Sequence, residues 1–373
     1  MGFKGMTKMD GRRKLAREVL SGAKSMTEAC KEAEVSRPTG YRWVRRAQEM
    51  GIEEMEAFST RPHHSPQATP LEVEAEVLAL KDQREAWGAE KLLDLGWPGR
   101  KGMVAPICVR TADRILAKHG KVQKRSKPPV KVGSFERSEC NELHQVDFKG
   151  MGRRPHPYVP LTVIDDRSRF CLAFEPLPGE GWEGVWETLW RVFGEYGLPE
   201  SILSDNGNCF HSVRSRGPSR LEVRLWLLGV RTIHGRRRHP QTQGKVERLH
   251  RTLNTESPVP LRQMTLAEAR EVLPEVVRIY NWERPHKALG LWTPGEIYTP
   301  SPRPRPDRLP LHELPESAIK RKVDASGLVS YRGQAYRAGR GLVGEHIEIR
   351  EDEKGEAMYF AGIRIAPLHT LKV

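Results

Sequence analysis

The sequence has few cysteines and lacks long apolar runs. Its five cysteines are widely scattered and none forms a Cys-x-x-Cys pair, which argues against a zinc module and against a disulfide framework. No apolar run approaches the roughly 18 residues that a membrane span requires. The first residues, MGFKGMTKMDGRRKL, lack the apolar stretch of a signal peptide. We therefore expect an intracellular, cytoplasmic protein with no membrane partner.

Acidic residues are outnumbered by basic ones. The chain has 62 Lys and Arg against 48 Asp and Glu, which leaves a net charge of +14 and a pI near 9.7. This excess favours a polyanionic partner, nucleic acid above all, although a basic surface can also serve solubility alone. Hydrophobic residues make up 38% and charged residues 29% of the 373 residues, a composition typical of folded domains, of which two to four are expected.

Residues 1–58 predict a small helical domain. Three short helices are expected over residues 10–48, and Ser25 with Glu28 forms a capping box at the start of the second. The third helix begins after Ser36 and is rich in Arg. A short helix, a tight turn and an Arg-rich helix are typical of a helix-turn-helix, whose second helix enters the major groove. The alternative is a helical bundle with a solvated basic face. The candidate DNA contacts are Arg37, Arg42, Arg45 and Arg46.

Residues 66–124 predict a second helix-turn-helix domain, with or without a wing. Its first helix is expected to begin at a capping box formed by Thr69 and Glu72. Helices near residues 88–95 and 109–119 complete the predicted domain. The basic segment KVQKRSKPPVKV follows, and it suits either a path along phosphates or a solvated linker.

Three further regions follow from the change of pattern after this segment. Residues 135–299 contain three strands, a helix and then strands separated by helices, which predicts an α/β layer domain. Residues 300–317 are too rich in Pro for a helix or a sheet and predict an extended spacer. Residues 318–373 show several hairpin signals and predict a small β-barrel of about five strands.

Three acidic residues form the candidate catalytic set. Asp147 lies inside the first strand of the α/β domain, Asp205 ends a later short strand, and Glu247 lies on the helix after Pro240. If the two strands are neighbours in the sheet, the two Asp carboxylates lie side by side. Two divalent cations about 3.5–4 Å apart can cleave a phosphodiester bond, because one activates the nucleophile and the other stabilises the leaving oxygen. The alternatives are a simple turn at Asp205 and an exposed helix charge at Glu247.

Asp165 and Asp166 are a competing pair of acids. If the strands on either side pair as a hairpin, Asp147 faces about residue 160, and the level of Asp165 is roughly 16 Å further along the strand. That distance is too long for a shared pair of metal ions. We therefore interpret Asp165 and Asp166 as part of a turn.

Motifs within residues 141–298 resemble the catalytic core of DDE transposases and retroviral integrases, a fold similar to ribonuclease H. The order of the predicted domains is similar to that of bacterial insertion-sequence transposases, so the resemblance covers nearly the whole chain. The matching segments are VDF at 146–148, DDRSRF at 165–170, SDNG at 204–207, HPQTQGKVERLHRTL at 239–253 and YNWERPHKALGLWTPGEIY at 280–298.

The resemblance implies that Asp147, Asp205 and Glu247 are the catalytic acids and hold two Mg²⁺ ions, with Mn²⁺ as a substitute. The segment between Asp205 and Glu247 is longer than usual in this family, and the zinc-binding His/Cys domain of retroviral integrases is absent from the sequence. The resemblance also implies a DNA interface around Glu247, although a solvated basic face is the alternative. Its candidate contacts are Arg236, Arg237, Arg238, Gln241, Thr242, Gln243, Lys245, Arg248 and Arg251.

We therefore expect a multidomain α/β protein with a ribonuclease H-like catalytic core, N-terminal helix-turn-helix domains and a small C-terminal β-barrel. The expected function is that of a DNA transposase, acting as a homo-oligomer on double-stranded DNA. It would bind the terminal inverted repeats of a mobile element, cleave them, and join the 3′-hydroxyl ends to target DNA. The alternatives are a nuclease of the same fold without strand transfer and a DNA-binding regulator with an inactive core.

Overall fold

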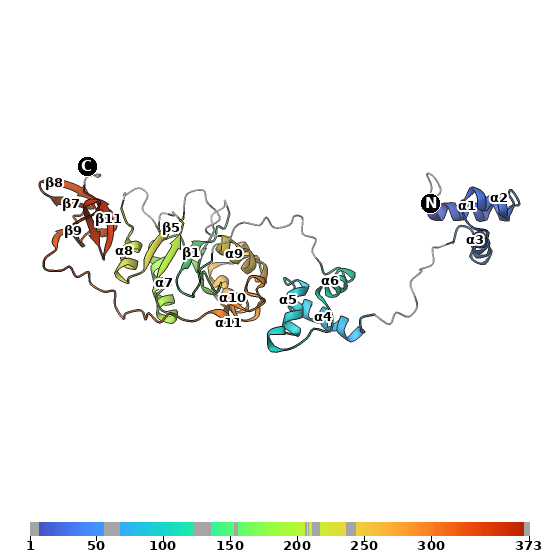
Figure 1. The fold of residues 1–373 in the computed structure, drawn as a ribbon, viewed down its shortest axis with the longest axis horizontal. Helices are drawn as coiled ribbons and strands as arrows, with labels where there is room; N and C mark the ends of the chain where they lie inside the picture. Colours follow the sequence, from blue (N-terminus) through green and yellow to red (C-terminus); the bar gives the residue numbers. More distant parts are fainter. Residues whose placement is uncertain are drawn as a thin grey trace. The chain divides into compact units, whose positions relative to one another are not determined.

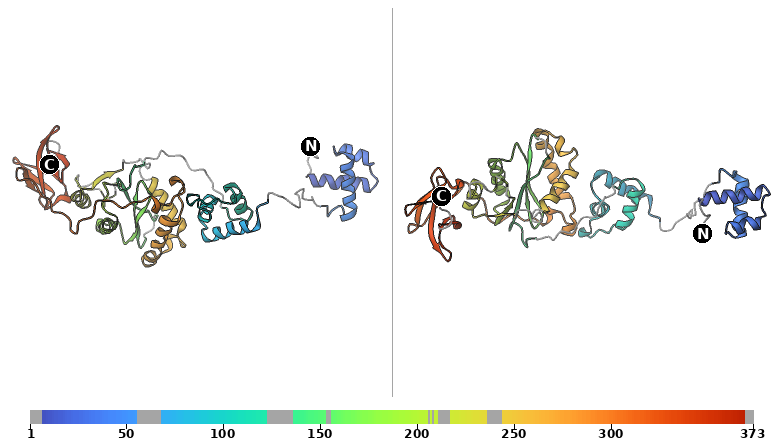
Figure 2. Two further views of the ribbon diagram at one scale, coloured as in Figure 1. Left: turned by 60° about the horizontal axis from the view of Figure 1, so that its bottom comes forward. Right: turned by 90° about the horizontal axis from the view of Figure 1, so that it is seen from above.

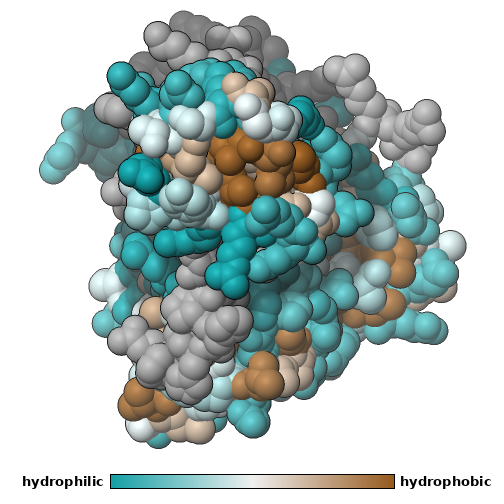
Figure 3. Space-filling view, turned by 90° about the vertical axis from the view of Figure 1, so that its right-hand side faces the viewer, coloured by the Kyte–Doolittle hydropathy of each residue, from teal (hydrophilic) through white to brown (hydrophobic). Residues whose placement is uncertain are grey.

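The chain forms two compact units in its computed structural model, Met1–Ala68 and Thr69–Val373 (Figure 1). The structure describes residues 7–55, 68–122, 136–152, 156–205, 207, 209–210, 217–235 and 244–368. In these ranges no helix is both long and apolar enough to cross a membrane. On the face drawn in Figure 3, hydrophilic residues predominate and apolar residues gather in a few groups.

The first unit consists of three short helices, as its sequence predicts: α1 (Lys8–Leu20), α2 (Met26–Glu32) and α3 (Arg37–Met50). The capping box at the start of α2 is confirmed, because the Ser25 side chain accepts from the Glu28 amide and the Glu28 side chain accepts from the Ser25 amide. The Ser36 hydroxyl, which precedes α3, bonds instead to Thr39 Oγ1 at 2.9 Å. Leu15, Ala29, Cys30 and Val44 form the core between the helices.

The second unit begins with another group of three helices: α4 (Leu71–Gln83), α5 (Ala89–Gly96) and α6 (Val109–Lys118). The capping box predicted at Thr69 is wrong, because Pro70 takes the N-cap position of α4. Trp87 lies in the core of this group, and its Nε1 donates to Glu256 Oε1 of the following α/β domain at 2.9 Å.

The α/β domain is built on a mixed five-stranded sheet with the order β3-β2-β1-β4-β5. Strands β1, β2 and β3 are antiparallel neighbours, whereas β4 runs parallel to β1 and β5 runs parallel to β4. The three meandering strands and the α/β layer arrangement that the sequence predicts are therefore confirmed. The strands are β1 (His144–Phe148), β2 (Val159–Asp165), β3 (Cys171–Leu177), β4 (Ser201–Ser204) and β5 (Arg231–His234).

Helices cover both faces of this sheet (Figure 2). One core contains apolar residues of α7 (Trp182–Tyr196) and α8 (Arg220–Leu227) packed on the strands. The other contains residues of α9 (Gly244–Glu256) and α10 (Leu266–Arg278) packed on the opposite face. After α10 the chain continues directly as a π-helical turn, Ile279–Glu283. Because α9 lies on the sheet, the residues of its first turn are held close to the strands.

The Pro-rich segment 300–317, all of which is described, contains neither helix nor strand, as its composition predicts. It is nevertheless fastened to the α/β domain. The carbonyl of Arg303 accepts from Leu198 N at 2.7 Å, and its guanidinium donates to Pro199 O at 2.8 Å. The Arg305 guanidinium lies over the Trp190 ring, 4.4 Å from its centroid. The segment is therefore a docked strap rather than a free spacer.

The C-terminal region forms two small sheets instead of one closed barrel within residues 318–368, the part of it that is described. One sheet has four strands in the order β11-β10-β9-β6, and β7 pairs with β8 in a separate hairpin. The hairpin signals in this region are confirmed, because β7 pairs with β8 and β9 pairs with β10 in antiparallel register. Their shared core includes Val223 of α8, so α8 covers apolar surface that a closed barrel would bury internally. The strands are β6 (Ile319–Lys322), β7 (Leu328–Tyr331), β8 (Gln334–Arg337), β9 (His346–Asp352), β10 (Gly355–Phe360) and β11 (Ile363–Pro367).

Candidate active site

Asp147 and Asp205 lie at the same edge of the sheet. β1 and β4 are parallel neighbours, and Val146 pairs with Ser204. The next residue along β1 is Asp147, and the residue that follows β4 is Asp205, so the register places these two carboxylates next to each other. The expectation that the two strands are neighbours is therefore confirmed. The carboxyl ends of parallel strands are also where ligand sites of α/β sheets collect.

The Asp205 carboxylate is oriented by a tight turn. Its Oδ1 accepts a hydrogen bond from the Gly207 amide at 2.8 Å, which is the geometry of an Asx turn. The turn that the sequence suggests at this position is present, and it fixes the carboxylate at the edge of the sheet. A Cβ atom added at Gly207 would stand 2.8 Å from Asp205 Oδ1, closer than real Cβ contacts.

Changing Gly207 to Ala should therefore displace the Asp205 carboxylate without opening a cavity. If the activity expected from the sequence is present, Gly207→Ala should lower the rate of metal-dependent DNA cleavage by about 10- to 100-fold, while the melting temperature changes little. Gly150→Ala is the matched control, because a Cβ there meets nothing within 4 Å. Equal cleavage rates for the two variants would show that the position of Asp205 is unimportant.

Glu247 lies in the first part of α9, on the flank of the face that packs on the sheet. The neighbouring Val246 is fully buried and Leu249 nearly so, whereas Glu247 is exposed. One turn further along, His250 Nε2 lies 2.6 Å from Thr162 Oγ1. Thr162 is the cross-strand partner of Asp147, so this hydrogen bond holds α9 beside the strand that carries Asp147.

Electrostatics connect the three acids. The pKa of Asp147 is raised to about 7, first by burial and then by the negative charges of Asp205, Glu247 and Glu180. A carboxyl group responds in this way when other carboxylates are close and little solvent separates them. The negative charges of Asp205, Glu247 and Glu180 therefore reach Asp147 at the edge of the sheet, and we call these four side chains the acidic cluster. Glu180, which precedes α7, belongs to this cluster and carries no motif that would have revealed it from the sequence.

The donor chemistry of the cluster fits Mg²⁺, which prefers carboxylate oxygens and keeps several waters. The paired positions of Asp147 and Asp205 also fit such an ion. Within the described residues, however, no group of three His, Cys, Asp or Glu side chains is close enough together to hold a metal ion. Glu247 is thus near enough to perturb Asp147 but does not complete a ready-made set of ligands.

Asp165 and Asp166 lie in a buried turn, as interpreted from the sequence. Asp165 accepts from Asn141 N at 2.7 Å and from the amide and hydroxyl of Ser168 at 2.8 and 2.7 Å. Asp165 pairs with His144 across the sheet, only three residues from the level of Asp147, or about 10 Å. The predicted register was wrong by two residues, because Asp147 faces Thr162 rather than residue 160. Two facts therefore keep Asp165 and Asp166 out of the site around Asp147. They lie at a distance from it, and their carboxylates are already occupied by hydrogen bonds.

The predicted DNA contacts fall into three groups. Six of them lie outside the described residues: Arg236, Arg237, Arg238, Gln241, Thr242 and Gln243. Arg248 and Arg251 on α9, and Arg37, Arg42 and Arg45 on α3, are exposed, whereas Arg46 is half-buried. Lys245 differs from all of these, because its ammonium forms an ion pair with Asp166 at 2.6 Å.

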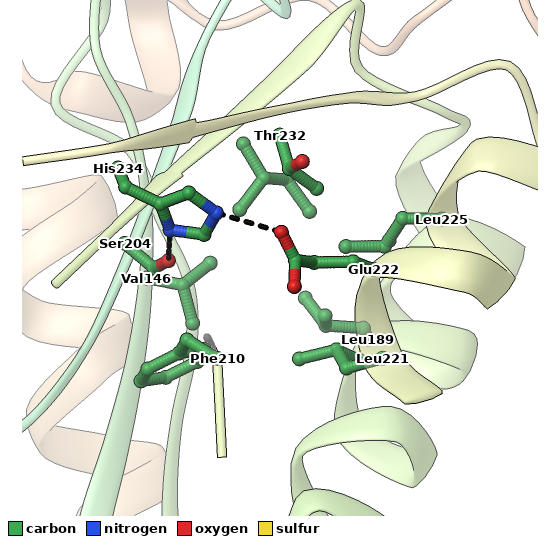
Figure 4. A pocket seen from close by; sticks show the side chains of 10 residues that line it. Val146, Leu189, Ser204, Phe210, Leu221, Glu222, Leu225, Thr232 and His234 are labelled. Atoms are coloured by element: carbon green, nitrogen blue, oxygen red, sulfur yellow. Dashed lines mark hydrogen bonds and ion pairs between the residues drawn. The ribbon is translucent and has the colours of Figure 1, made fainter. Parts of the chain in front are cut away.

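A polar cluster missing from the sequence prediction supports the strand that leads to Asp205 (Figure 4). His234 Nε2 on β5 lies 2.8 Å from Glu222 Oε1 on α8, and His234 Nδ1 lies 3.5 Å from Ser204 Oγ on β4. Glu222 also closes a capping box with Ser219 at the start of α8. These bonds hold α8 and β5 against β4. The sequence signal was the Ser-x-x-Glu spacing of that box.

Three segments of the chain match known protein families. Residues 4–84 match the leucine-zipper of insertion element IS481, residues 228–294 match the integrase core domain, and residues 319–368 match the C-terminal domain of IS481 family transposases. Two of these matches are to segments of IS481 elements, and the third is to an integrase core. The integrase core match includes Glu247, whereas Asp147 and Asp205 precede it. Within the zipper match, the described residues form the short helices α1 to α4 rather than one long helix.

Solved structures of retroviral integrases are similar to parts of the chain. The catalytic core domain of BIV integrase is 24% identical and covers 42% of this chain and 93% of its own, with a TM-score of 0.32. The HTLV-2 integrase catalytic core domain in complex with magnesium (trimeric form) is 17% identical over 42% of this chain and 95% of its own, also with a TM-score of 0.32. A chain of the simian T-cell lymphotropic virus intasome in complex with PP2A regulatory subunit B56 gamma is 15% identical. The match covers 78% of this chain and 99% of that one, with a TM-score of 0.37.

Proposed function

We propose that this chain is a DDE-type DNA transposase, a polynucleotidyl transferase that cleaves the ends of a mobile element and joins their 3′-hydroxyl groups to target DNA. The observation that supports this most strongly is the acidic cluster at the carboxyl ends of β1 and β4, in which Asp205 and Glu247 both raise the pKa of Asp147. The same chain contains segments that match a transposase domain and an integrase core. This makes DNA the expected substrate of the cluster.

Asp147, Asp205 and Glu247 would hold two Mg²⁺ ions, with Mn²⁺ as a substitute. The similar HTLV-2 integrase core was solved in complex with magnesium. The ions would supply activation of the attacking oxygen and stabilisation of the leaving oxygen. The protein's own contribution would be to bring carboxylates from two strands and one helix toward the same edge of the sheet. It also orients Asp205 through the Gly207 amide.

The remaining parts of the chain would bind DNA. Exposed Arg248 and Arg251 follow Glu247 along α9, where they can contact phosphates near the scissile bond. We propose that the helical modules containing α1 to α6 act as helix-turn-helix domains that recognise the terminal inverted repeats, with the Arg-rich α3 entering the major groove. Two element ends must be held together, which requires a homo-oligomer on DNA.

The test is an assay of the full-length protein with a labelled duplex carrying the element end and an unlabelled target duplex. We expect nicking at the end and a longer, labelled strand-transfer product in Mg²⁺ or Mn²⁺, and neither product in EDTA. Cleavage without the joined product would identify a nuclease of this fold. Specific DNA binding with neither product in any divalent ion would identify a regulator and overturn the proposal.

A further inference from the structure

Lys245 is a cation in the first turn of α9 whose ammonium is turned toward the protein. Its Nζ lies 2.6 Å from Asp166 Oδ2, and the side chains of Lys245 and Asp166 are 10% and 0% exposed. The same ammonium donates to the backbone carbonyl of Asp166 at 2.9 Å. Lys245 therefore grips both the side chain and the main chain of the turn between β2 and β3.

This position is unfavourable for a cation unless a nearby negative charge compensates it. The start of a helix carries partial positive charge, which repels a nearby Lys, and burying an ammonium removes its hydration. Asp166 offsets both effects and is itself rigidly held. Its Oδ1 accepts from Gln145 Nε2 at 2.7 Å, and its Oδ2 accepts from the Arg137 amide at 2.8 Å. Since Gln145 is on β1, the pair connects the start of α9 to the strand of Asp147.

The geometry of α9 relates this contact to Glu247. Successive residues of a helix are turned by about 100°, so Lys245 and Glu247 lie on opposite flanks of the buried Val246. Fixing Lys245 on one flank thus fixes the rotation of the helix and the direction of Glu247 on the other. The hydrogen bond between His250 and Thr162 is a second tie one turn further along.

We propose that Lys245 is a positioning residue, and that its ion pair with Asp166 sets the rotation of α9 that directs Glu247 toward Asp147. This inference rests on the proposed function of Glu247. It assigns Lys245 a different role from the phosphate contact expected from the sequence. To reach a phosphate, the ammonium would have to leave a fully buried carboxylate without its cation, which is strongly unfavourable.

The first experiment measures hydrogen–deuterium exchange in the full-length protein without DNA or metal. Lys245→Met and Asp166→Asn should accelerate exchange of amides 248–251 by about tenfold or more, while amides of α7 stay unchanged and Lys245→Arg remains close to the wild type. Arg191→Met is the matched control, because it removes a cation from an exposed ion pair with Glu175 at 2.7 Å. Unchanged exchange in α9 for both variants would overturn the proposal, whether or not the protein cleaves DNA.

The second experiment separates positioning from DNA contact. We expect Lys245→Met to raise the Mn²⁺ concentration for half-maximal cleavage by about tenfold. Lys245→Arg should need a Mn²⁺ concentration close to that of the wild type. The affinity of Lys245→Met for DNA without metal should be unchanged. A phosphate contact would instead lower the salt slope of DNA binding by about one unit, and that result would refute the positioning role. If the wild type itself does not cleave DNA, the proposed function fails, and the exchange experiment still decides whether Lys245 and Asp166 fix α9.

Discussion

Replacing Asp147 with Asn, or Glu247 with Gln, is expected to lower metal-dependent end cleavage and strand transfer by about a thousandfold, or about 4 kcal/mol of transition-state stabilisation. Each substitution exchanges a charged carboxylate for a neutral amide of nearly the same shape. An amide is a weaker ligand for a hard divalent cation. Because the site offers so few carboxylates, the loss of one should impair both nucleophile activation and leaving-group stabilisation.

The comparison requires a control and a measurement of DNA binding. Glu187→Gln is suitable, because Glu187 is an exposed glutamate on α7, on the opposite face of the sheet from α9. It should cleave at the wild-type rate. The two active-site variants should bind the element end in EDTA with wild-type affinity, since their effect lies in chemistry rather than binding. Retained cleavage in either variant would remove that residue from the catalytic set.

The placement of Asp147 and Asp205 could be predicted because it follows from local pattern and from sheet geometry. Strand alternation located β1, the short apolar run before Asp205 located β4, and ligand sites collect at the carboxyl ends of parallel strands. The structure has these strands as parallel neighbours. The direction of the Glu247 side chain was harder to predict, because it depends on contacts between distant parts of the chain. Lys245 meets Asp166 and His250 meets Thr162, and no periodicity within α9 indicates either partner.

The register of the β1–β2 hairpin and the shape of the C-terminal region show a second limit. Side-chain alternation fixes which face a residue occupies, but a shift of two residues preserves that alternation. The predicted register could therefore be wrong by two while every inward-facing residue stayed inward. Similarly, turn residues predicted the hairpins β7–β8 and β9–β10, whereas the pairing of β9 with β6 joins segments far apart in sequence. Local signals do not determine such pairings.

Helix α8 was not predicted from the sequence, although a signal for it was present. Its eight residues, Arg220–Leu227, follow a capping box of Ser219 and Glu222, the same signal that located α2 correctly. The consequence reached beyond one helix, because α8 supplies Glu222 to the polar cluster behind Asp205 and Val223 to the C-terminal core.

In the absence of divalent ions, Asp147→Asn is expected to stabilise the protein at pH 8 although it removes activity. The pKa of Asp147 rises from 3.8 to about 7 in the folded protein, through burial and then through Asp205, Glu247 and Glu180. A carboxyl group with a raised pKa binds its proton more tightly in the folded state than in the unfolded state. The stability that this proton contributes is complete below about pH 4, and it is lost as the pH rises through about 7.

The size of the effect follows from the same shift. A change of about three pKa units corresponds to at most about 4 kcal/mol between low pH and pH 8. An Asn at position 147 carries no charge at any pH, so the variant escapes this loss. Its advantage over the wild type in urea unfolding with EDTA should be largest at pH 8 and smaller by about 2 kcal/mol at pH 5.5. Glu187→Gln, which exchanges an exposed glutamate of α7, is the control variant for this series.

Divalent ions should reverse the order of stability. If Mn²⁺ binds the acidic cluster as proposed, it would neutralise these carboxylates in the folded state alone, and it should raise the unfolding midpoint of the wild type at pH 8. Asp147→Asn lacks one of the ligands and should respond much less. Two results would contradict this account. If Asp147→Asn is less stable than the wild type at pH 8 in EDTA, these carboxylates do not repel one another. If its unfolding midpoint responds to Mn²⁺ as much as that of the wild type, they do not share an ion. Because unfolding is measured without DNA, this result tests the acidic cluster independently of any catalytic assay.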